Sequence, residues 1–101
     1  MAILARMSDP QRSDPALPGQ DLIERGLLDL ARCNESIEAL LVSIGAPRLR
    51  RIGLTVPPVF ADAERRLYER LAESGSDTAH GRYNALVRRL VSFERAAECA
   101  G

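Results

Sequence analysis

The sequence lacks lysine and tryptophan, and aromatic residues make up only 4% of its 101 residues. So few aromatic side chains argue against a surface that stacks nucleic-acid bases. The 14 basic residues, all of them arginine, balance 14 acidic ones, so the formal net charge is zero. A neutral chain is poorly suited to neutralising phosphates or anionic lipid as its main task.

Cysteine and long apolar runs are also scarce. Cys33 and Cys99 lie far apart and neither belongs to a CxxC motif, so the chain carries neither a disulfide framework nor a zinc motif. No apolar run approaches the roughly 20 residues that span a bilayer. Residues 1–5 are too short for a secretory signal, because Arg6 interrupts the apolar stretch. We therefore expect a cytoplasmic protein.

Residues 1–20 predict a flexible N-terminal arm. They contain three prolines and two copies of the triplet Ser-Asp-Pro, and a residue that precedes proline is disfavoured in the helical region. Whether the protein starts at Met1 or at Met7 stays open. The length of the chain allows one domain, which we place at residues 21–101.

An apolar stripe at helical spacing runs through residues 21–44. Its members recur at alternating intervals of four and three, which places them on one face of a helix. They are Ile23, Leu27, Leu30, Ile37, Leu41 and Ile44, and the polar Asn34 shares the same spacing. Because the phase survives residues 33–36, we expect one continuous helix that ends at Gly45 and Pro47. The alternative, two shorter helices with Asn34 capping the second, stays open.

Two further helices are predicted after a proline-rich connector, residues 46–58. The first runs over residues 58–74, since proline is favoured at a helix start. The second runs over residues 76–98 and repeats the four-three spacing. The fold class is therefore all-α, a small helical bundle or an open helical hairpin. It has two long amphipathic helices, a short connector turn and a third helix.

No motif for catalysis, cofactor binding or metal binding is present, so we predict a protein that is not an enzyme and needs no cofactor or metal. The one histidine, His80, is interpreted as a surface side chain at the start of the last helix. The rival hypothesis is an active site built from His80, Tyr83 and Asn84.

The amount of apolar stripe predicts a protein partner. Two long seams exceed what a thin helical domain easily buries, and an amphipathic helix without a partner in its own chain binds one in another. Arginines at the rim would set orientation and specificity. The predicted partner-binding residues are Ile37, Leu41, Arg48, Arg50, Arg51, Arg82, Leu86, Arg89, Leu90 and Phe93.

Two alternatives for the function stay open. Residues 46–101 hold ten arginines against seven acids, a net charge of +3, and Arg48, Arg50 and Arg51 are the densest basic point. A small nucleic-acid-binding regulator would use that cluster. A self-associating helical homodimer would instead pair the apolar seams of two copies.

Residues 44–54 (IGAPRLRRIGL) and 82–95 (RYNALVRRLVSFER) resemble small helical proteins of high-GC bacteria that accompany a nucleotidyltransferase-like toxin as its antitoxin. The resemblance covers about a quarter of the chain and includes no diagnostic motif, so it transfers no functional residue. It implies a non-catalytic subunit that binds the toxin near its active site and restrains it. An antitoxin is the sharpest form of the partner-binding prediction.

Overall fold

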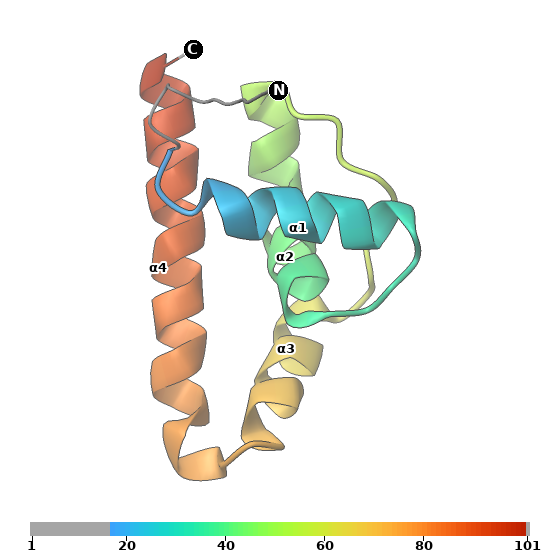
Figure 1. Cartoon of the computed structure of the whole chain (residues 1–101), viewed down its shortest axis with the longest axis vertical. Coiled ribbons are helices and arrows are strands. Elements are labelled where there is room, and N and C mark those ends of the chain that lie inside the picture. The colour runs from blue at the N-terminus through green and yellow to red at the C-terminus, as the bar shows by residue number, and fades with distance from the viewer. Residues whose placement is uncertain (1–16, 101) are drawn as a thin grey trace, which may run out of the picture.

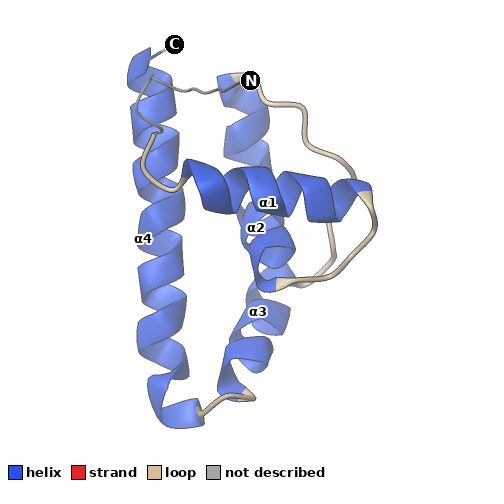
Figure 2. Cartoon of the chain, in the orientation of Figure 1, coloured by secondary structure: helices blue, strands red, loops and turns tan. Residues whose placement is uncertain are grey.

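The computed structural model describes residues 17–100, and within them the chain forms helices and no strand (Figure 2). The predicted all-α fold class is therefore confirmed. Residues 1–16 of the predicted arm, and with them the question of Met1 or Met7, lie outside the described residues. The four helices are α1 (Gln20–Ala31), α2 (Ile37–Ile52), α3 (Ala63–Ala72) and α4 (Ser76–Ala100).

Helix α2 packs against each of the other three helices. In Figure 1, α2 and α3 follow one another alongside α4, and α1 crosses α2 on the face toward the viewer. Helix α4 has 25 residues, which makes it about 37 Å long at 1.5 Å per residue. Leu40, Leu41 and Leu49 of α2 are fully buried. The core is thus built around α2, and α4 is the long edge of the molecule.

The prediction of one continuous helix over residues 21–44 is wrong. Helix α1 ends at Ala31, and the chain turns through a loop in which Cys33 has a positive φ of 56°. Asn34 lies exposed in this loop and not in a helical seam. The chain reversal lays the first half of the stripe, on α1, against its second half, on α2, and both halves contribute to one core.

Ser36 caps α2, two residues after Asn34, which the alternative of two shorter helices named as the cap. Its hydroxyl oxygen accepts the backbone N–H of Ala39 at 3.0 Å and donates to the Asp29 carboxylate at 2.6 Å. This hydrogen bond lowers the pKa of Asp29, although burial of the carboxyl opposes the effect. One hydroxyl therefore both starts α2 and ties it to the last turn of α1.

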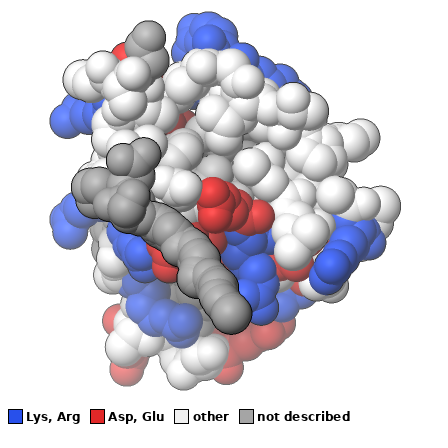
Figure 3. Space-filling view, turned by 45° about the horizontal axis from the view of Figure 1, so that its top comes forward, with Lys and Arg blue, Asp and Glu red and all other residues white. Residues whose placement is uncertain are grey.

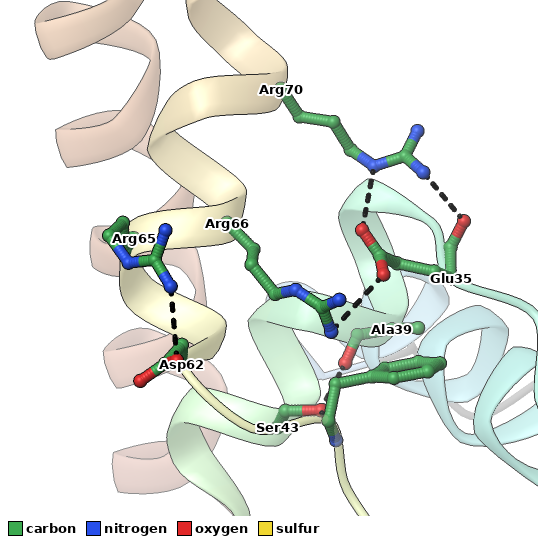
Figure 4. A network of polar contacts seen from close by, with 8 residues as sticks. Glu35, Ala39, Ser43, Asp62, Arg65, Arg66 and Arg70 are labelled. Carbon is green, nitrogen blue, oxygen red and sulfur yellow. Dashed lines mark hydrogen bonds and ion pairs between the residues drawn. The ribbon is translucent and has the colours of Figure 1, made fainter.

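Glu35, beside this cap, holds the same loop against α3 (Figure 4). Its carboxylate lies 3.3 Å from the guanidinium of Arg66 and 3.5 Å from that of Arg70. Arg70 also donates to the backbone carbonyl of Glu35 at 3.1 Å. A single loop residue thus fixes where the loop between α1 and α2 meets α3.

Gly45 and Pro47 do not end α2, which continues to Ile52 and stops before Gly53. A Cβ atom at residue 45 would lie 2.8 Å from a methyl carbon of Leu90 on α4. The glycine therefore permits close packing of two helices. In the sequence, a glycine at this position is equally compatible with a helix stop.

Helix α3 begins at Ala63, five residues after the predicted start at Pro58. The preceding segment is held in another conformation, because the Phe60 backbone N–H donates to the Ser43 hydroxyl at 3.3 Å and Asp62 has a positive φ of 54°. Tertiary contact with α2 thus overrides the local preference of proline for a helix start.

The crossing of α1 over α2 depends on Gly26. A Cβ atom there would lie 2.4 Å from the carbonyl oxygen of Glu38 and 2.4 Å from a methyl carbon of Val42. We expect Gly26→Ala to lower the free energy of unfolding by at least about 2 kcal/mol, because a backbone oxygen cannot move aside as a side chain does. Urea unfolding followed by circular dichroism measures this change.

Gly81→Ala is the matched control. Gly81 also lies in a helix, but a Cβ atom there meets nothing within 4 Å. This change should raise the free energy of unfolding by about 0.5–1 kcal/mol, since alanine favours the helix. A Gly26→Ala protein as stable as the wild type would contradict the described crossing.

Candidate protein-binding surface

Two surface hollows flank the point where the start of α1 meets α4. Gly19, just before α1, is close to the α4 backbone: a Cβ atom there would lie 2.9 Å from the carbonyl oxygen of Arg89. From this point α1 runs away from α4 across α2 (Figure 1). The contact leaves one hollow toward the N-terminal half of α4 and another toward its C-terminal end.

The first, which we call the basic hollow, has a volume of about 350 Å³. It is lined by residues of α1, α2 and α4, namely Leu22, Ile37, Glu38, Arg82, Ala85, Leu86 and Arg89. Four of the predicted partner-binding residues, Ile37, Arg82, Leu86 and Arg89, meet here although they are far apart in the sequence.

The basic hollow combines apolar side chains with arginine. Ile37 and Leu86 are half-buried, whereas Arg82 and Arg89 are exposed. Arg89 lies 3.4 Å from the carboxylate of Asp21, and both side chains are at least half exposed. Such an exposed ion pair is weak and easily exchanged for another partner.

The second, which we call the apolar groove, has a volume of about 490 Å³. It lies between α1, the end of α2 and the C-terminal part of α4. Its lining residues are Leu17, Gln20, Ile23, Glu24, Leu27, Ile52, Leu54, Phe93, Ala97 and Ala100. Phe93 is the one predicted partner-binding residue among them.

Leu41, Leu90 and Phe93 lie in the core of the chain, with exposed fractions of 0%, 4% and 5%. They were predicted to supply apolar contact to a partner, but in the fold they belong to the hydrophobic core of their own chain. Their spacing in the sequence is equally that of a core stripe, so sequence alone does not separate the two uses.

Arg48, Arg50 and Arg51 lie at the end of α2, apart from the basic hollow. Arg48 donates to Glu98 of α4 at 2.5 Å, an interaction that raises its pKa, and lies 3.7 Å from Glu94. Arg50 and Arg51 are exposed in the last turn of α2, where a positive charge interacts favourably with the helix dipole. Arg48 thus connects two helices.

Glu94 is a buried carboxylate that the sequence analysis missed. It is only 4% exposed and packs against Gly45. Burial raises the pKa of the Glu94 carboxyl above its ordinary value, and Arg48 opposes this by a smaller amount. One signal was present, because Glu94 follows Leu90 by one helical turn and Leu90 belongs to the buried stripe of α4.

His80 is exposed and lies 3.2 Å from the side-chain amide of Asn84, one turn further along α4. Tyr83 turns the other way, toward Tyr68 of α3, with the ring centres 5.8 Å apart. The three residues of the rival active site therefore do not converge on one point. Neither the basic hollow nor the apolar groove includes them.

Charges of both signs are mixed on the face seen in Figure 3, with uncharged surface between them. Across residues 17–100, no three histidine, cysteine or acidic side chains come together as metal ligands would. None of the four described helices combines the length and the hydropathy needed to cross a membrane. No protein-family model, curated protein or solved structure matches this chain.

The buried Glu94 makes stability depend on pH. The Glu94 pKa is higher in the folded state than in the unfolded state. The protonated carboxyl therefore contributes its full stability at pH values below the unfolded-state pKa, and this contribution is lost as the pH rises through the folded-state pKa. Glu94→Gln removes this loss. We therefore expect the variant to gain stability relative to the wild type as pH rises from about 4 toward 7.

Urea unfolding of both proteins across that pH range measures the difference. The decisive result is that the difference in free energy of unfolding between the two proteins grows with pH. Glutamine nearly preserves the shape of the side chain, so a difference that depends on pH reports the charge of Glu94. A difference that stayed constant, or that shrank with rising pH, would show that Arg48 outweighs burial at this carboxylate.

Proposed function

We propose that the protein is a non-catalytic helical subunit that acts by binding another protein. The observation that carries this proposal is the basic hollow, in which α1, α2 and α4 together present half-buried aliphatic side chains beside exposed arginines. An apolar pocket with a polar rim is the usual composition of a protein-binding site, and arginine is enriched in such sites.

The chemistry of the hollow favours a particular partner surface. Arg82 and Arg89 are two helical turns apart, about 10 Å along α4. An apolar anchor on the partner would lie between them against Leu86 and Ile37. Acidic residues beside that anchor would pair with the arginines and replace the weak contact between Arg89 and Asp21.

An antitoxin is the sharpest form of this proposal. The resemblance to antitoxins of nucleotidyltransferase-like toxins includes residues 82–95, and this stretch supplies Arg82, Leu86 and Arg89 to the basic hollow. The partner would then be the cognate toxin, held in a restrained state through this surface.

The nucleic-acid alternative has less support. In the cluster that would contact phosphates, Arg48 is paired with Glu98 and Glu94 of α4, so only Arg50 and Arg51 remain without a described ion pair. The homodimer alternative would use the same basic hollow and is an outcome of the experiment below.

Ala85→Glu tests the surface without touching the core. Ala85 lines the basic hollow but is exposed on α4, so a longer acidic side chain should leave the fold intact and obstruct the hollow. We expect capture of the partner from the native host to fall at least about tenfold, as for loss of a central interface residue. The capture is done after nuclease treatment and at moderately high salt, with mass spectrometry of the bound proteins.

Ala31→Glu is the matched control, because Ala31 is also exposed but lies at the end of α1 away from α4. It should capture the partner as the wild type does. A captured nucleotidyltransferase-like protein, whose toxicity this chain suppresses on co-expression, supports the antitoxin form. Equal capture by both variants, or a bait that returns only copies of itself, contradicts the proposed hetero-complex at this surface.

A further inference from the structure

The apolar groove lies where the described part of the chain begins. Leu17 forms part of its wall, and the Leu17 backbone N–H donates to the side-chain oxygen of Gln20 at 3.0 Å. The Gln20 side chain in turn donates to Glu24 at 2.8 Å. Residues 1–16 therefore join the described chain at the edge of this groove.

The groove is suited to a short apolar segment. Its aliphatic lining includes Ile23, Leu27, Ile52 and Leu54, and its one charged lining residue is Glu24. Apart from Ile23, these aliphatic side chains are only partly buried within the described chain. Covering them would remove apolar surface from water, which is favourable.

The chain contains such a segment. Residues 1–5 read Met-Ala-Ile-Leu-Ala, the longest apolar run before Leu17, and Arg6 follows with a charge opposite to that of Glu24. The thirteen peptide units from Leu4 to Leu17 span up to about 43 Å when extended, more than a return to the groove requires. A tether of this length holds the segment at an effective concentration of the order of millimolar.

We propose that residues 1–5 bind back into the apolar groove, with Ile3 and Leu4 against its aliphatic wall and Arg6 beside Glu24. The N-terminal segment would then be an intramolecular strap that connects α1, the end of α2 and the C-terminal part of α4. This inference is independent of the proposed function, because the contact of Gly19 with α4 separates the groove from the basic hollow.

The five isoleucines of the chain are well placed to test the strap by methyl NMR of the full-length protein. Ile23 and Ile52 line the groove, Ile37 lines the basic hollow, and Ile44 lies beside α3. We expect nuclear Overhauser contacts from the Ile3 methyl to those of Ile52 and Ile23, and none to Ile37 or Ile44.

Leu4→Asp in the full chain should abolish these contacts and shift the Ile52 and Ile23 signals while the Ile37 and Ile44 signals stay in place. Gln11→Asp, which adds the same charge in the polar part of the arm, should change none of them. Two results would overturn the proposal: an Ile3 methyl without contact to the groove, or contacts seen only between differently labelled copies, which would identify a second chain as the occupant.

Discussion

The close packing of α1 and α4 onto α2 is the constraint on which the rest of the structure depends. Gly26 lets α1 approach the backbone of α2, and Gly45 lets Leu90 and Glu94 of α4 approach α2 elsewhere along its length. Both neighbours are thereby fixed to α2, while α1 meets α4 near Gly19. The two hollows exist because α1 leaves α4 at that point.

Polar contacts in this fold determine how the helices are positioned relative to one another more than they stabilise the folded state. Glu35 places the loop between α1 and α2 on α3, and Arg48 connects α2 to α4, but these arginines remain partly exposed and such pairs are worth little. The packed leucines of α2 supply the main favourable term, because burying apolar surface dominates folding. Glu94 runs against that trend, since its carboxylate is buried and burial raises its pKa although Arg48 lies 3.7 Å away.

The two hollows differ in chemistry, and that difference separates their proposed uses. The basic hollow offers arginine beside aliphatic side chains, which suits a partner that carries both acidic and apolar groups. The apolar groove offers almost no charge and lies where the N-terminal segment joins the domain. A surface of this kind is suited to a segment already tethered beside it.

Local patterns in the sequence determined the helical class, the approximate position of α4 and the apolar stripes, because helical periodicity is a property of neighbouring residues. Only the tertiary structure decided that the stripe through residues 21–44 folds back on itself, that Gly45 serves a helix contact, and that Leu41, Leu90 and Phe93 are core residues. The same structure brought Ile37 beside Leu86 and separated Arg48 from Arg82. Periodicity specifies which face of a helix is apolar, whereas the neighbour that covers this face depends on chain reversal and close approach between distant segments.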